Sequence, residues 1–337
     1  MIAIIGLLLQ LMLPAIQASR ERARKTTCQN HLKQLAIAAQ VHVNSRNYFP
    51  SGGWSGAFMA DPRRGYGREQ PGSWLYSLLE YMEESTLRAA GGERLEDFPL
   101  GSGLQALYQS APPMFYCPSR RDARAYPFKQ KGNGHWSLSV AQGVLLLPAV
   151  TKADYAANSG DSIYSAAEQF SDEPQMWVPK NYDALKTEPQ TWTDTTNPQS
   201  SYFQNGVSYY RSQVRPAQVL DGMSKTYLCG EKFLAPEFYD DVNQSDSPAM
   251  MGDNQSAWAG FEWDNHRVAW NPKSRWPVEA YQPRQDGPGG AFAGCFAFGS
   301  PHPGSLNMAF CDGSVRDVGY DIDMQVHRRQ ANRLDGE

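Results

Sequence analysis

The stretch IAIIGLLLQLMLPAIQASRERARKTTCQNHLKQLAIAAQ, residues 2–40, decides the fold of this chain. Residues 1–16 carry no charge, and Gln10 is their only polar side chain. Charges follow at residues 20–25, and beyond them apolar residues recur at the spacing of one helical face. The pattern predicts one long helix over residues 1–44, apolar in its first part and amphipathic in its second. The residues of the predicted buried face are Cys28, Leu32, Leu35, Ala36, Ala39 and Val43.

The apolar segment 1–16 is short for a membrane span. At 1.5 Å per residue it would measure about 24 Å, whereas the hydrocarbon core of a bilayer is about 30 Å thick. By itself it is compatible with a marginal span, the core of a signal peptide or a buried helix. A signal peptide is disfavoured because its basic residues precede the apolar stretch, whereas here they follow it. Basic residues at 20–25 would by themselves favour a cytoplasmic globular domain.

The rest of the 337-residue chain has a soluble composition and is long enough for one large or two modest domains. Its formal net charge is −4, and residues 20–25 form its only basic cluster. Nucleic acid is excluded as a partner, because such binding needs a broad positive surface.

Motifs of common enzymes are absent from the sequence. It contains no G-x-S-x-G, no H-E-x-x-H, no P-loop and no G-x-G-x-x-G. His302, Ser305, Asp312 and Ser314 have the side chains of a nucleophilic site and lie close in sequence. However, Pro303-Gly304 directly after His302 is typical of a turn. We therefore predict a protein without catalytic activity.

Aspartates in Gly-, Asn- or Ser-containing loops are candidates for a calcium site, the one cofactor that the sequence suggests. Carboxylate oxygens are the ligands that Ca²⁺ prefers, although the spacing does not match an EF-hand and Asp-Gly alone is a turn motif. The candidate ligands are Asp154, Asp161, Asp221 and Asp312.

The chain has five cysteines, with no C-x-x-C pair and no histidine at the spacing of a zinc finger. Cys295 and Cys311 are symmetric about Pro303 in a predicted hairpin, so a disulfide between them is geometrically possible. The alternative is that all five cysteines are small buried side chains.

Four tryptophans lie close together in the sequence and allow two interpretations. One is a stacking surface for sugar rings; the other is a place in the core, which is the more common use of large aromatic side chains. We favour the core. The four are Trp258, Trp263, Trp270 and Trp276.

Short elements are also predicted from local patterns. Residues 73–87 should form a second amphipathic helix capped by Ser73, which packs on the first. Residues 114–119 and 226–229 should form strands, the second after a turn at Asp221-Gly222.

The N-terminal stretch resembles the helix of prepilin-like proteins, specifically those of the planctomycete-type DUF1559 family. Later motifs resemble the same family: Cys117-Pro118-Ser119, Asp154-Tyr155-Ala156, Gly230-Glu231 and SPHPGSLNMAFCDGSVR at residues 300–316. In that family the helix opens on a Gly-Phe-Thr-Leu-Val-Glu stretch with a peptidase cleavage site. The printed sequence begins inside the apolar segment, and we expect the natural start to lie upstream of Met1.

The resemblance implies an α+β fold of the pilin type, with an antiparallel sheet against the second half of the helix. Residues 1–16 would be the membrane segment, residues 45–324 the DUF1559-type globular domain and residues 325–337 a charged tail. Stretches rich in Pro, Ser, Thr and Asn predict insertions near residues 162–208 and 240–290.

The resemblance also implies a function. The protein would be a non-catalytic, pilin- or pseudopilin-like subunit of a cell-surface or secretion filament, associated with the membrane, with other copies or with other pilin-like subunits. It would cross the inner membrane once with its globular domain outside the cytoplasm, because the family's basic leader precedes the apolar segment. Membrane and assembly contacts are then expected from Ile4, Ile5, Gly6, Leu9, Leu13 and Pro14.

Two further expectations accompany the resemblance. Cys117 of the Cys-Pro-Ser motif could bridge to Cys28 on the helix. The alternative function is a membrane-anchored, extracytoplasmic binding protein that recognises a glycan or a secreted cargo through its Trp-rich insertion.

Overall fold

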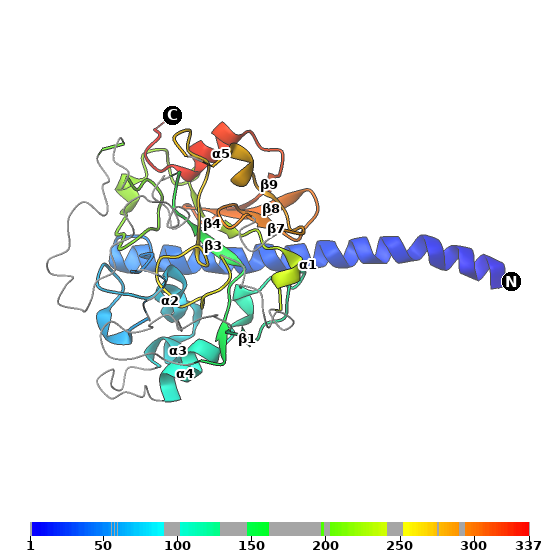
Figure 1. Cartoon of the computed structure of the whole chain (residues 1–337), viewed down its shortest axis with the longest axis horizontal. Helices are drawn as coiled ribbons and strands as arrows, with labels where there is room; N and C mark the ends of the chain where they lie inside the picture. The colour runs from blue at the N-terminus through cyan, green and yellow to red at the C-terminus, as the bar shows by residue number, and fades with distance from the viewer. Residues whose placement is uncertain are drawn as a thin grey trace.

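The computed structural model describes residues 2–54, 56, 58, 60–90, 102–128, 147–161, 197–198, 203–240, 252–274, 276–289 and 294–336. Helix α1, Ile2–Arg46, is 45 residues long and continues through Pro14. Figure 1 shows its second half inside the globular body and its first half projecting far beyond it.

The predicted division of α1 into two parts is confirmed. Among the α1 residues whose side chains are described, Cys28 is the first that is buried, and the predicted face from Leu32 to Val43 is buried in the main core. On the opposite side, Ile37 and Val41 are exposed. The helix is therefore amphipathic where the body covers it, because only one face meets the core.

A five-stranded sheet covers one side of α1. Its order is β5-β3-β4-β8-β9; β3 and β5 are parallel and the other neighbours antiparallel. Helix α1 packs against β4, β8 and β9. These elements confirm an α+β fold with a mainly antiparallel sheet. The strands are β3 Tyr155–Asn158, β4 Tyr227–Glu231, β5 His266–Arg267, β8 Ser305–Phe310 and β9 Val315–Gly319.

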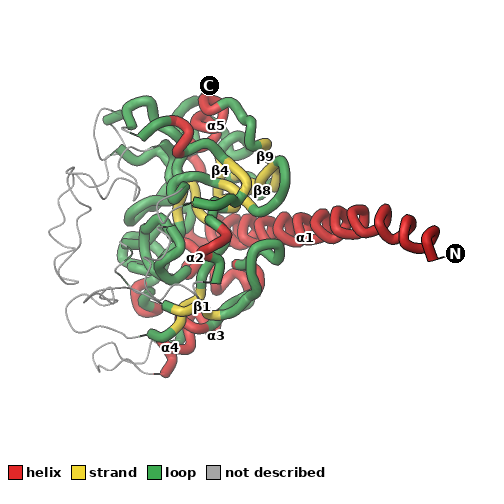
Figure 2. Tube along the Cα trace, turned by 45° about the vertical axis from the view of Figure 1, so that its right-hand side comes forward, coloured by secondary structure: helices red, strands yellow, loops and turns green. Residues whose placement is uncertain are grey.

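Short helices lie on the other side of α1, as Figures 1 and 2 show. Trp74 and Leu79 of this layer share one core with Leu35 of α1. The layer consists of α2 Trp74–Leu78, the 3₁₀ helix η2 Leu79–Met82, α3 Ser85–Ala89 and α4 Ser102–Gln109, with the small sheet of β1 Ala125–Pro127 and β2 Ala149–Thr151 beside it.

Two local predictions need correction. Ser73 caps its helix as expected, but the helix over residues 73–87 is broken at Glu83, whose φ of 63° is left-handed. Residues 114–119 are not a strand: 114 and 115 belong to the 3₁₀ helix η3, Pro113–Phe115, and the residues after them form a bend and a turn. Prolines 112, 113 and 118 fix φ and remove N–H donors, which disfavours pairing in a sheet.

Part of the predicted charged tail, residues 325–337, is folded against the body. Residues Met324–Ala331 form helix α5, in which His327 and Ala331 are buried, and Arg333 beyond it is buried too. The remaining short elements are β6 Arg284–Gln285 and β7 Gly299–Ser300, which pair in parallel, and the 3₁₀ helices η1 Pro62–Arg64, η7 Pro216–Gln218, η8 Pro236–Phe238 and η9 Val278–Ala280.

Most of the predicted insertion 162–208, and residues 241–251 of the second one, lie outside the described residues. Within the part of the chain that is described, no helix has both the length and the apolar character needed to cross a membrane.

Candidate functional site

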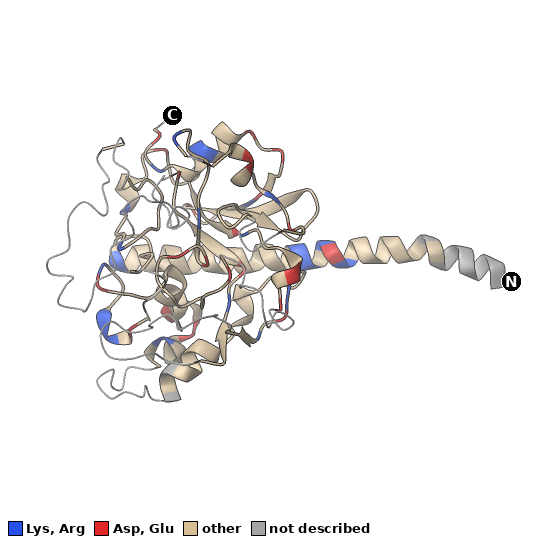
Figure 3. Cartoon of the chain, viewed as in Figure 1, with Lys and Arg blue, Asp and Glu red and all other residues tan. Residues whose placement is uncertain are grey.

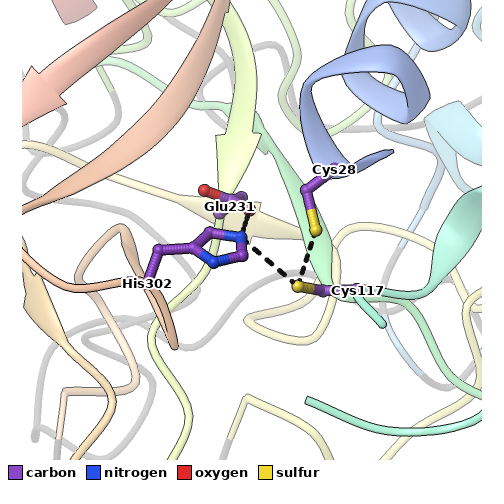
Figure 4. Close-up of side chains that lie close together, drawn as sticks. All are labelled: Cys28, Cys117, Glu231 and His302. Atoms are coloured by element: carbon purple, nitrogen blue, oxygen red, sulfur yellow. Dashed lines mark hydrogen bonds and ion pairs between the residues drawn. The ribbon is translucent and has the colours of Figure 1, made fainter. Parts of the chain in front are cut away.

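Four buried side chains that can bind a metal converge where α1 enters the body. They are Cys28 of α1, Cys117 after η3, Glu231 at the end of β4 and His302 in the turn between β7 and β8 (Figure 4). Each is 0 % exposed to solvent. Their ligand atoms all lie within 4.8 Å of one another, and among the described residues no second group of this kind occurs.

Three distances define the geometry of this cluster. The two sulfur atoms, Cys28 Sγ and Cys117 Sγ, lie 2.7 Å apart. Cys117 Sγ lies 3.6 Å from Nε2 of His302, and the same Nε2 lies 3.3 Å from Oε1 of Glu231. The imidazole therefore stands between the thiols and the carboxylate.

Cys117 is held by a buried network of charges. Its backbone N–H donates to Oδ2 of Asp154 at 2.7 Å. Oδ1 of Asp154 lies 3.3 Å from Arg120 and 2.6 Å from Arg121. The guanidinium groups fix the carboxylate, which in turn fixes the backbone that carries the thiol.

Glu231 is oriented from the neighbouring strand β8. Its Oε2 accepts hydrogen bonds from the backbone N–H of Asn307 at 2.7 Å and from Nδ2 of Asn307 at 3.0 Å. Its Oε1 accepts no hydrogen bond from the described residues and has only the ionic contact with His302. One carboxylate oxygen is thus anchored in the sheet while the other faces the cluster.

His302 is fixed by its turn and by α1. Its N–H donates to the hydroxyl of Ser300 at 3.1 Å, and its carbonyl accepts from the hydroxyl of Tyr320 at 2.7 Å. The ring Nδ1 lies 2.7 Å from Oε1 of Glu21, whose carboxylate also accepts from the hydroxyl of Ser119. Because Nδ1 faces a carboxylate, it carries a proton, and Nε2 is directed at the thiols.

The surroundings change the pKa values of two members of the cluster. Burial lowers the pKa of His302, but the contacts with Cys117 and Glu231 outweigh it and raise the pKa to about 10. Burial, followed by the hydrogen bond with Cys28, raises the pKa of Cys117 well above its usual value. The side chains of this cluster have the donor atoms for thiol pairing or metal binding.

The four candidate calcium ligands are not brought together. None belongs to the cluster, and they contact separate protein groups. Asp154 pairs with Arg120 and Arg121, and Asp161 contacts Asn205 and Arg328. Asp312 accepts hydrogen bonds from the N–H and hydroxyl of Ser314, which closes the turn between β8 and β9, while Asp221 lies in the turn before β4.

The predicted pairing of Cys295 with Cys311 needs correction. Strand β8 pairs with β4 and β9, and the turn of the hairpin lies at residues 312–313, so Pro303 is not its centre. The Sγ of Cys311 lies 3.6 Å from the Tyr227 carbonyl, whereas Cys295 lies near Gly252. All five cysteines are free thiols, and Cys28 and Cys117 are a pair whose sulfur atoms lie within hydrogen-bond distance.

The four tryptophans do not form one exposed surface. Trp258 and Trp263 are buried in the main core, Trp270 is partly buried against it, and only Trp276 is exposed. The indole N–H of Trp258 donates to the carbonyl of Leu107 at 2.8 Å. At least two of the rings are therefore covered on the faces that a sugar would need.

Of the predicted membrane and assembly residues, Leu13 and Pro14 lie on the exposed outer part of α1. The side chains of the other four, Ile4, Ile5, Gly6 and Leu9, lie outside the described part.

Sequence reasoning missed the cluster because its members come from four separate segments. The missed residues are Glu231 and His302. The sequence did contain a signal for all four residues. Each lies in a motif that carries the family resemblance: the helix, Cys-Pro-Ser, Gly-Glu and His-Pro-Gly.

Comparison with known proteins agrees with that observation. Residues 17–325 match a family described as proteins of unknown function, DUF1559, and the match includes all four members of the cluster. No curated protein and no solved structure matches the chain. A family match over most of the length, which contains the sheet, α1 from Gln17 onwards and the buried cluster, establishes that the chain belongs to the DUF1559 family.

Proposed function

We propose that the protein is a non-catalytic, pilin-like structural subunit, anchored in the inner membrane by the first part of α1 and assembled through that helix into a filament. The observation that carries the proposal is the uncovered outer part of α1. Leu13 is 56 % exposed and Ile16 is 41 % exposed, although both are large and apolar.

Apolar side chains on a projecting helix favour a covering partner. Burying one Leu, Ile or Met side chain contributes about 1.5–3 kcal/mol. Along the same helix, charged residues gather where α1 leaves the body, and the described stretch beyond them carries no charge (Figure 3). This division suits a helix whose outer part is in a membrane or among other helices while its charged band remains in water.

The two coverings belong to different stages in this proposal. Before assembly the bilayer covers the outer part of α1, with the globular domain on the extracytoplasmic side. After assembly, the α1 helices of other copies cover it. Ile37, 49 % exposed, and Val41 would extend the contact between copies along the outward face of α1.

A pair of variants tests this proposal in the native organism. Leu13→Arg combined with Ile16→Arg should remove the protein from the membrane fraction and from sheared surface filaments, because a charge is costly in either apolar environment. Gln17→Arg, an exposed neighbour on the same helix, is the matched control and should fractionate as the wild type does. Unchanged fractionation of the double variant would contradict the proposal.

The alternative function, a membrane-anchored protein that binds a glycan or secreted cargo through its Trp-rich stretch, has less support. Trp258 and Trp263 are core residues, and of the four tryptophans only Trp276 is well exposed.

A further inference from the structure

We propose that Cys28, Cys117, Glu231 and His302 form a binding site for a thiophilic divalent cation, with Zn²⁺ as the reference ion. The site would fasten α1 to the globular body. It is independent of whether the protein assembles into filaments, because all four ligands lie within one chain.

The distances around His302 fit tetrahedral zinc. With Zn–S near 2.3 Å and Zn–N or Zn–O near 2.0–2.1 Å, tetrahedral ligands are separated by about 3.6 Å for sulfur and nitrogen and about 3.4 Å for nitrogen and oxygen. The observed separations are 3.6 Å from Cys117 Sγ to His302 Nε2 and 3.3 Å from that nitrogen to Glu231 Oε1.

The two sulfur atoms must move apart to complete the tetrahedron. They lie 2.7 Å apart, whereas two thiolates on one zinc ion are separated by about 3.8 Å at the same bond length. A movement of about 1 Å is within reach of a small rotation of the Cys28 or Cys117 side chain.

Hydrogen-bond partners around the four ligands orient them as in known metal sites. Ligating histidines usually donate their second ring N–H to a carboxylate, and Glu21 lies 2.7 Å from Nδ1 of His302. Asn307 holds the outer oxygen of Glu231, and Asp154 accepts from the N–H of Cys117. Three of the four ligands thus have an outer partner that leaves the ligand atom directed at the centre.

Charge compensation favours the same ion. Metal binding releases the two thiol protons, so Glu231 and two thiolates bring three negative charges into a volume without solvent, where they need a cation as a partner. Zn²⁺ compensates two of them, and the sulfur and imidazole donors select such an ion over Ca²⁺ or Mg²⁺. Oε1 of Glu231, which accepts no hydrogen bond from the described residues, becomes a ligand.

A disulfide between Cys28 and Cys117 is the competing chemistry. It would consume both sulfur donors and leave only His302 and Glu231, too few for a stable zinc site. The two states can be separated by experiment, because a disulfide removes two protons from the intact mass and a metal site adds one metal per chain.

The test uses the full chain without a histidine tag, purified under reducing, oxygen-free conditions. After incubation with Zn²⁺ and dialysis, elemental analysis should give one zinc per chain. Co²⁺ in its place should give intense visible bands of tetrahedral cobalt and a near-ultraviolet sulfur-to-cobalt band, which report the ligands directly. Cys229→Ser, a buried cysteine outside the cluster, is the matched control and should keep the full stoichiometry.

Ligand variants identify the site. Cys117→Ser should abolish the sulfur-to-cobalt band or greatly weaken it, and His302→Gln should lower Zn²⁺ affinity more than Glu21→Gln does. Glu21 is only partly buried and acts on Nδ1, so its variant should keep the fold and weaken Zn²⁺ binding by about 10–100-fold. Circular dichroism checks the fold of each variant.

Three results would overturn the proposal. The first is the absence of stoichiometric Zn²⁺ or tetrahedral Co²⁺ in the reduced wild type. The second is unchanged binding in folded Glu21→Gln and His302→Gln. The third is protein from native membranes that carries a Cys28–Cys117 disulfide and no metal.

Discussion

At the scale of single residues, this fold buries many polar groups in specific partnerships. Arg121 contacts both Asp154 and Asp253. Burial lowers the pKa of Arg121, but the two carboxylates outweigh burial and raise this pKa well above its usual value. Breaking such a buried pair on one side is costly because the other charge stays without a partner. Neutral histidines are buried as well, and they make stability depend on pH.

His327 is a buried histidine outside the cluster whose protonation makes stability depend on pH. Burial lowers its pKa to about 4, and its ring packs against Tyr227 and Phe298. Between pH 6.5 and 4 the His327 side chain is protonated in the unfolded chain but not in the folded chain. The free energy of unfolding therefore falls as pH decreases from 6.5 to 4. Below pH 4 both states are protonated, and this contribution changes no further.

The variant His327→Gln has no titrating side chain at this position, so its free energy of unfolding should fall less on acidification. The difference in unfolding free energy between wild type and variant should change by about 1.4 kcal/mol per pH unit between pH 6.5 and 4. Denaturant titrations at a series of pH values measure it, with pH 8 as the baseline where both side chains are neutral. Parallel pH profiles would show that His327 is not buried in the neutral form.

At the scale of elements, α1 organises the molecule. Its buried residues pack on the sheet on one side and on the short helices on the other, and polar side chains attach it to the β8–β9 hairpin. Lys25 lies 3.2 Å from Asp317, and Lys33 donates to the carbonyl of Gly313 at 2.7 Å. The hairpin is thus fixed on the helix by core packing and by charge.

Substitutions at two apolar residues of α1, Leu35 and Ile37, distinguish the buried side of the helix from its exposed side. Leu35→Ala should lower the free energy of unfolding by about 2–5 kcal/mol, because Leu35 is fully buried and its removal leaves a cavity. Ile37→Ala, on the exposed face, should change it by no more than about 0.5 kcal/mol. Chemical denaturation of the purified protein measures both, and equal effects would contradict the assigned orientation of the helix.

The sequence allowed α1 and its buried face to be predicted because amphipathic periodicity is a local property. Strand β4 and the turn at Asp221-Gly222 before it were predictable because their signals are local too. The sheet order was not, since β3 pairs with β4 across about seventy residues of chain. The residues around Cys117 were assigned wrongly because proline outweighed the apolar pattern, and the cluster was missed because only tertiary structure joins its four segments.

At the scale of the whole molecule, a globular body is attached to a long helix that it covers only in part. A monomer that leaves Leu13 and Ile16 uncovered has apolar surface available for another contact. The buried cluster lies where covered and uncovered parts of α1 meet, so a metal there would hold the helix against the body when force is applied along a filament. The two proposals are therefore compatible, although each is tested separately.

Cross-linking between copies through α1 tests the central claim most directly. All five native cysteines are buried and should react slowly in the folded protein, so Ile16→Cys introduces one accessible thiol per chain. In cells of the native organism, a short thiol-specific cross-linker should convert this variant into covalent dimers, because neighbouring α1 helices pack together, whereas Asn44→Cys at the far end of α1 serves as a control for random collision. Monomers alone, at wild-type abundance in the membrane and surface fractions, would contradict the filament account.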